Sequence, residues 1–312
     1  MPPTHIDIID SDSLNAYAFS SQGHEFIGIC AGTITIIHGI FFRFLSDSNL
    51  FPHLGDPNLE SATLPKLSTN LRSTTTFLTD PIAISQPNDP IRKLYAHWMS
   101  RIAMDFILFH EHAHLASGHV GYLKDKYNQP FIAELGAVSS PTQPEPLDFQ
   151  ALEMDADCCS VGNVLAHLQE NPPRELAAIV NDELSHIYER LLAVYVVFRV
   201  FGFEEFSSSA LQLGTHPPPP MRAQMVFATA LEIFKKRGLE DDEVAAMIGG
   251  MFRKIIGVVE DAFKQACVSR LEGKGLLQAG EPEQSQHVGE ILSRWKVTRP
   301  TLLPFARSKL AE

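Results

Sequence analysis

The chain has 312 residues, of which 45% are hydrophobic, and it carries a formal net charge of -12 at pH 7. This length and composition allow a large buried core in one domain or two. The acidity argues against a nucleic-acid binder or an anionic-membrane binder, because both functions require a basic surface. The four cysteines show no C-x-x-C spacing, which is typical of a reduced, cytoplasmic protein.

The N-terminal residues 1–25 are polar and lack the basic and apolar pattern of a secretory signal. The segment 26–45, FIGICAGTITIIHGIFFRFL, is long enough to cross a membrane, but it contains three glycines, His38 and Arg43. We therefore predict a polar lead-in followed by a buried helix, with or without a strand before it. A membrane span at 26–45 stays the alternative.

The stretch from 46 to 90 is rich in proline, serine, threonine, asparagine and aspartate, so it predicts loop with at most short helices or strands. A loop of this length is either the lid or rim of a site or a mobile surface excursion.

From 91 to about 127 the apolar residues recur at helical spacing, with Asp89 and Pro90 as the start signal. This predicted long helix contains His110-Glu111-His112-Ala113-His114, an H-E-x-x-H motif. Its outer histidines lie one turn apart on the same face and can bind one zinc ion, while Glu111 can reach a water on that ion. His112 is expected to face away.

The rest of the chain predicts further helices separated by proline-rich connections. A linker at 137–148 is too rich in proline to be regular, and 214–220 (GTHPPPP) predicts a rigid turn. The helices are expected at 149–169, from 172 to about 201, at 221–237, at 240–271 and near 288–295, the last followed by a loose tail. Clear strand signals are few, so the predicted fold is mostly α, with few or no strands.

A catalytic zinc site needs a third protein ligand. In the variant H-E-x-x-H-x-x-G-x-x-H this ligand would stand at position 120, which is Val120, and His119 is out of register, so we interpret His119 as a helix-packing or rim residue. The alternative is a carboxylate on a second helix. Glu153 and Asp157 share a helix face, so that one can bind the metal while the other orients a ligand histidine.

An ordinary solvated acidic face is the competing interpretation of Glu153-Met154-Asp155-Ala156-Asp157. The apolar neighbours favour burial. Among them are Cys158 and Cys159, which cannot easily bond each other and are interpreted as small apolar helix residues.

These motifs resemble a known group. H-E-x-x-H followed by E-x-x-A-D resembles the pattern of the gluzincin metallopeptidases. Thr215-His216-Pro217-Pro218 with Arg222 is similar to the T-H-P-P…R element of the prenyl-protease and heat-shock membrane protease family, but a convincing set of membrane spans is missing. The nearer match is the soluble Lit peptidase family of phage-exclusion proteins. The resemblance rests on three short stretches between Phe109 and Arg222.

The resemblance implies a role for each matching residue. It implies that His110, His114 and Glu153 are zinc ligands and that Glu111 is the general base. It implies that His216 donates to the oxyanion formed when water attacks a carbonyl, although His216 is alternatively a turn residue held by its prolines. Asp157 then orients a ligand histidine, and Arg222 anchors the loop or an acidic partner such as Asp157.

The expected protein is therefore a cytoplasmic, helical zinc endopeptidase with a protein or peptide substrate and no nucleic-acid or membrane partner. Residues 1–90 would supply the apolar segment and loop, 91–272 the metallopeptidase core and 273–312 a short helix and tail, all in one compact domain. Two alternatives stay open. One is a regulatory or binding protein that keeps a catalytically silent zinc scaffold, and the other is a membrane-embedded peptidase.

Overall fold

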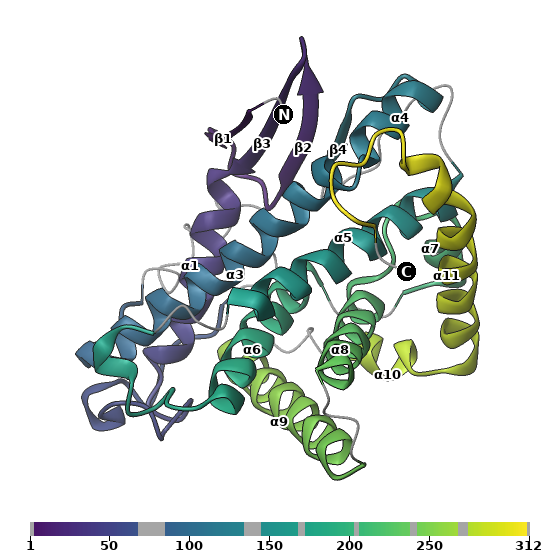
Figure 1. Cartoon of the computed structure of the whole chain (residues 1–312). Coiled ribbons are helices and arrows are strands. Elements are labelled where there is room, and N and C mark those ends of the chain that lie inside the picture. Colours follow the sequence, from purple (N-terminus) through teal and green to yellow (C-terminus); the bar gives the residue numbers. More distant parts are fainter. Residues whose placement is uncertain are drawn as a thin grey trace.

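The computed structural model describes residues 3–67, 85–133, 145–167, 172–202, 206–237, 242–267 and 274–310. They form a mostly helical protein with a small four-stranded sheet at one end (Figure 1). The mostly α class predicted from the sequence is confirmed. The four strands exceed the few or none that the pattern predicted.

The sheet is built mainly from the N-terminal residues. Its strands are β1 (Thr4–Ile9), β2 (Ala16–Ser21), β3 (His24–Cys30) and β4 (Phe131–Ala133). In the order β1-β3-β2-β4, β1 is parallel to β3, and β2 is antiparallel to both β3 and β4. Gln22 and Gly23 have positive φ angles of 51° and 81°, as a tight hairpin turn favours. The polar lead-in predicted for 1–25 is wrong, because small alanines, Ala16 and Ala18, form the buried face of β2.

The apolar segment 26–45 contains most of β3 and then the largely buried helix α1 (Ala31–Leu45). This agrees with the predicted buried helix. Arg43 is buried with it, where its Nη1 lies 3.4 Å from Asp47 Oδ2 and its Nη2 donates to the carbonyl of Pro65. Across the described ranges, we find no helix with the length and apolarity that a membrane crossing needs.

Helix α3 runs through the middle of the molecule, with α5 beside it (Figure 1). Its start follows the predicted signal, since Asp89 accepts a hydrogen bond from the Arg92 backbone N–H and Pro90 is the first helical residue. α3 also packs against α1 and α6. The bounds are α3 (Pro90–Ala116), α5 (Pro146–Ala166) and α6 (Glu183–Phe201).

The single helix predicted for 91–127 is instead two helices. The break is Gly118, whose φ of +81° is left-handed. A Cβ on this residue would lie 2.6 Å from backbone atoms of Phe305 and Ala306, so no side chain fits there. Helix α4 (His119–Tyr127) therefore leaves α3 in a new direction.

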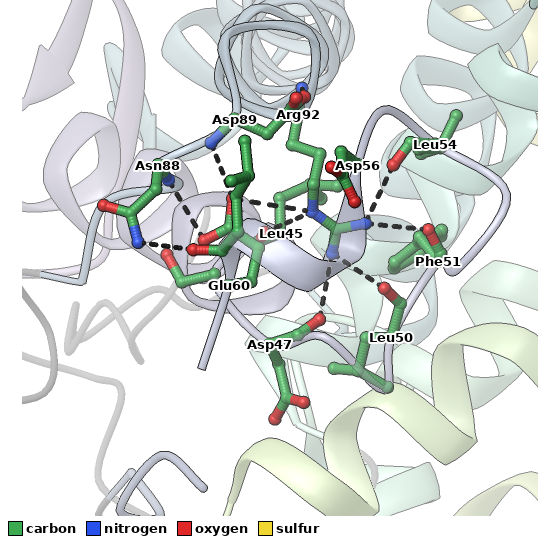
Figure 2. Close-up of polar contacts among 12 residues, drawn as sticks. Leu45, Asp47, Leu50, Phe51, Leu54, Asp56, Glu60, Asn88, Asp89 and Arg92 are labelled. Atoms are coloured by element: carbon green, nitrogen blue, oxygen red, sulfur yellow. Dashed lines mark hydrogen bonds and ion pairs between the residues drawn. The ribbon is translucent and has the colours of Figure 1, made fainter. Parts of the chain in front are cut away.

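The guanidinium of Arg92 organises the chain that follows α1 (Figure 2). The side chain is fully buried and donates to five backbone carbonyls at 2.8 to 3.0 Å. These carbonyls belong to Leu45, Asp47, Leu50, Phe51 and Leu54. Glu60 completes the arrangement by accepting hydrogen bonds from the backbone N–H groups of Asn88 and Asp89.

These contacts count against a lid or rim at the described start of the 46–90 stretch, residues 46–60. His110 follows Arg92 by about 27 Å along α3, at 1.5 Å per residue. The described residues up to Glu60 are therefore fixed at the opposite end of α3 from the histidines, by hydrogen bonds that a mobile excursion would lack. Residues 68–84 lie outside the described part of the chain.

The other predicted helices form with shifted bounds. α5, α8 and α9 match the expected helices closely. The helix expected from 172 starts later, because a short 3-10 turn comes first and the capping box of Asp182 and Ser185 sets the start of α6. α11 is longer than the helix expected near 288–295, and it packs against α5. The remaining bounds are η1 (Pro57–Leu59), η3 (Arg174–Leu176), α7 (Ser208–Leu213), α8 (Pro219–Lys236), α9 (Asp242–Ala266), α10 (Lys274–Ala279) and α11 (Pro282–Leu302).

Candidate metal centre

His110 and His114 lie one turn apart on α3, facing α5. Their side chains are buried, and their Nε2 atoms are 3.0 Å apart. Burial lowers the pKa of His114 well below its ordinary value, and the neighbouring His110 and His119 lower it further. Its ring is therefore neutral near pH 7, which is the form that binds metals.

Glu153 on α5 meets both histidines. Its Oε2 lies 3.2 Å from His110 Nε2, and its Oε1 lies 3.3 Å from His114 Nε2. One ligand atom from each of the three residues lies within 4.8 Å of the others, so this buried cluster could hold a metal ion. The four-residue spacing brings the histidines together, whereas the packing of α5 on α3 brings in the glutamate.

The donor chemistry of the cluster fits a cation. Neither oxygen of Glu153 accepts a hydrogen bond within the described residues, although its side chain is completely buried. Arg222 Nη2 is 3.7 Å away, too far for a hydrogen bond. A buried carboxylate without hydrogen bonds is costly, and a cation between the two imidazoles and this carboxylate would offset that cost.

The outer nitrogen of His110 faces Asp157, as the sequence prediction requires. The distance from His110 Nδ1 to Asp157 Oδ1 is 3.0 Å. Arg222 on α8 binds Asp157 through Nε and Nη2, each at 2.8 Å. Burial alone would raise the pKa of the Asp157 carboxyl, but the Arg222 charge and hydrogen bonds hold it below its ordinary value. Asp157 therefore stays ionised and can accept the Nδ1 hydrogen of His110.

The outer nitrogen of His114 has a partner that the sequence analysis missed. His119, at the start of α4, is fully buried, and its Nδ1 is 3.0 Å from His114 Nδ1. Its other nitrogen, Nε2, lies 3.2 Å from Asp155 Oδ2 on α5. The interpretation of His119 as a helix-packing or rim residue is incomplete, because it assumed that α3 continues past Gly118. The left-handed glycine was the available signal.

Glu111 and His216, the two residues proposed for catalysis, lie in different surroundings. Glu111 is fully buried on α3. The pKa of Tyr17 on β2 is raised mainly by burial and by Cys30, with a smaller contribution from Glu111, so the Glu111 carboxylate lies within electrostatic reach of the sheet. His216 precedes α8, and its Nε2 is 3.4 Å from Glu153 Oε1, so the structure brings it to the cluster.

Two other features lie outside the cluster. His112 is exposed, as expected for a residue that faces away from the ligand pair.

A cavity of about 840 Å³ lies between α5, α8 and α11, and its lining includes Asp155, Cys158 and Cys159 but none of the three candidate ligands. Burial raises the pKa of each of these thiols to about 12, so both are neutral, in agreement with their interpretation as apolar helix residues.

Comparisons with known proteins do not identify the chain: no protein-family model, no curated protein and no solved structure matches it.

Proposed function

We propose that this protein is a zinc-dependent endopeptidase of the gluzincin type that hydrolyses peptide bonds in a protein or peptide substrate. The observation that carries the proposal is the buried convergence of two imidazoles, from His110 and His114, with the Glu153 carboxylate. Two histidines and a glutamate form a ligand set of zinc hydrolases, which leaves a coordination position for water or substrate. The resemblance of the motifs to gluzincins and to the Lit peptidase family points to the same chemistry.

The proposed roles follow from the chemistry of each side chain. A bound Zn²⁺ would polarise the scissile carbonyl and lower the pKa of a water molecule to about 7. Glu111 takes the proton of the attacking water and passes it to the leaving amine. His216, next to Glu153, donates a hydrogen bond to the oxyanion that develops on the carbonyl oxygen. Asp157 holds the ligand histidine His110 from behind.

We further propose a reduced, cytoplasmic setting and no nucleic-acid partner. All four cysteines are free thiols, which supports the first point. The net charge of -12 supports the second, because an acidic surface repels phosphates.

Metal analysis tests the ligand set. Purified protein is expected to contain about one zinc per chain. The Glu153→Ala variant should lose it, whereas Glu175→Ala, which changes an exposed glutamate, should keep it. Retention of zinc by Glu153→Ala would show that the third ligand is wrong, and a wild-type protein without metal would remove the basis of the proposal.

The activity is tested with Glu111→Gln, which keeps the size of the side chain and removes the base. We expect bound zinc to remain and peptide-bond cleavage to fall about 10²–10⁴-fold. Profiling of new protein N-termini in cells that express either form would identify the substrate. If the two profiles are the same while both proteins hold zinc, the silent zinc-scaffold alternative is correct instead.

A further inference from the structure

Each ligand histidine has one nitrogen inside the cluster and one outside it. The outer nitrogen of His110 faces a carboxylate directly, in Asp157. The outer nitrogen of His114 faces another histidine, His119, and only the far side of that ring meets a carboxylate, in Asp155. His110 is therefore supported by one carboxylate directly, whereas His114 is supported by a second histidine that in turn faces a carboxylate.

The contacts that run from His114 through His119 to Asp155 join three helices. His114 belongs to α3, His119 to α4 and Asp155 to α5. The left-handed turn at Gly118 directs His119 back toward the end of α3. Trp295 from α11 packs against the His119 ring in a T-shaped contact, with centroids 6.3 Å apart. His119 and Asp155 are 0% and 1% exposed, so bulk water does not compete for their polar atoms.

The order of the groups favours one placement of the hydrogens. A carboxylate oxygen accepts, so Asp155 Oδ2, 3.2 Å from His119 Nε2, favours the His119 tautomer with its hydrogen on Nε2. In that tautomer His119 Nδ1 carries a lone pair, which can accept the Nδ1 hydrogen of His114 across 3.0 Å. That assignment leaves the lone pair of His114 on Nε2, the atom that lies 3.3 Å from Glu153 and faces the proposed metal.

We propose that His119 and Asp155 are positioning residues that hold His114 in the tautomer and ring orientation required of a metal ligand. The inference rests on the metal centre proposed above but not on peptide hydrolysis. Partners behind metal-binding histidines typically change metal affinity 10–100-fold when they are removed. Replacing His119 or Asp155 should therefore weaken metal binding more than it lowers the stability of the metal-free protein.

A purely structural role makes a different prediction. If the three buried groups only satisfy one another's hydrogen bonds, their replacement should change the stability of the metal-free protein and leave its metal affinity alone. Two substitutions of His119 separate these cases. His119→Phe keeps the ring and removes both nitrogens, whereas His119→Asn keeps an acceptor near the position of Nδ1.

The experiment measures Zn²⁺ affinity by competition with a chelating dye, the visible absorption of the Co²⁺-loaded protein, and thermal unfolding in EDTA. His119→Phe should bind zinc about 10–100-fold more weakly and shift the Co²⁺ bands, while His119→Asn stays close to wild type. His112→Phe is the matched control, because His112 is exposed on the same helix as the ligands. Asp155→Asn removes the charge behind His119 without a change of shape, and it too should weaken zinc binding.

The outcomes are distinct. Wild-type zinc affinity and Co²⁺ spectra in His119→Phe would overturn the positioning role and leave the metal centre intact. Equal losses of affinity in the Phe and Asn variants, matched by lower unfolding temperatures in EDTA, would also overturn it. If His119→Phe does not fold, unchanged zinc affinity in Asp155→Asn overturns it. A wild-type protein that binds neither Zn²⁺ nor Co²⁺ would instead remove the metal centre itself.

Discussion

Arg222 holds both carboxylate oxygens of Asp157, through Nε and Nη2, in two hydrogen bonds of 2.8 Å. Asp157 Oδ1 is in turn 3.0 Å from His110 Nδ1. The start of α8 is thus linked to a candidate ligand on α3 through a carboxylate on α5. The guanidinium also lies over the Phe198 ring of α6, at 5.3 Å from its centroid, so a cation–π contact helps to hold it in place.

The first prediction concerns the paired hydrogen bonds from Arg222 to Asp157. Arg222→Lys keeps the positive charge but cannot donate two parallel hydrogen bonds to one carboxylate. Asp157 should then orient His110 less strictly, and zinc affinity should fall about tenfold in a competition assay. Arg237→Lys changes an exposed arginine at the end of the same helix and should bind zinc as wild type does. Unchanged affinity in Arg222→Lys would argue against the orienting role of Asp157.

The second prediction concerns His216. In the proposed mechanism this residue donates to the oxyanion and does not hold the metal. His216→Phe should therefore lower kcat about 10²–10³-fold while the zinc content stays near one per chain. Peptide-cleavage kinetics and metal analysis on the same preparation check it. Loss of zinc from the variant would mean that His216 is a ligand, as its 3.4 Å approach to Glu153 also permits.

The third prediction concerns pH and stability at Glu189, which is buried on α6 and hydrogen-bonded to Tyr95 of α3. Burial raises its pKa from 4.5 to about 7, although the Tyr95 hydrogen bond and the Lys254 charge act in the opposite direction. A raised carboxyl pKa stabilises the folded protein below pH 4.5, and this contribution is lost as pH rises through 7. The free energy of unfolding should fall by about 3 kcal/mol between pH 4.5 and pH 8.5 from this group.

Urea unfolding in EDTA across that pH range checks the prediction, with Glu189→Gln as the comparison. Glutamine is neutral at every pH, so the variant should lack this part of the pH dependence. The groups that Glu189 raises, Tyr95 and Tyr188, titrate above this pH range, so the difference between the two curves isolates Glu189. Parallel curves would show that Glu189 is ionised in the folded state at neutral pH.

The fourth prediction concerns Arg92, which stands at the start of α3 and donates to five backbone carbonyls of the chain after α1 (Figure 2). Arg92→Lys cannot reach all of them, and each buried carbonyl left without a donor costs about 1–3 kcal/mol. We expect a loss of about 3 kcal/mol or more in the free energy of unfolding by urea. Arg101→Lys, at an exposed position of the same helix, is the control.

The folded Arg92→Lys protein should bind zinc as tightly as wild type, because the metal cluster is about 27 Å away along α3. A weaker zinc affinity with normal stability would mean that the two ends of α3 are coupled more closely than their separation suggests.

Local spacing made part of the site predictable. Two histidines four residues apart, or Glu153 and Asp157 at the same spacing, share a helix face wherever that helix packs. The buried helix after β3 was predictable for a similar reason, since its apolar character is continuous along the chain. A strand before that helix was left open, but β2 and β4 were not predictable, because their pairing joins residues remote in sequence and the alanines of β2 give little apolar signal.

The sequence by itself determined which residues could act together on one helix face: His110 with His114, and Glu153 with Asp157. Only the tertiary structure decided that Glu153 faces both inner nitrogens while Asp157 lies behind His110. It also decided that His119 turns back to His114 at Gly118, and that the start of the 46–90 loop lies at the far end of α3. The physical reason is that helical periodicity is a local property, whereas these contacts depend on the direction in which separate helices pack.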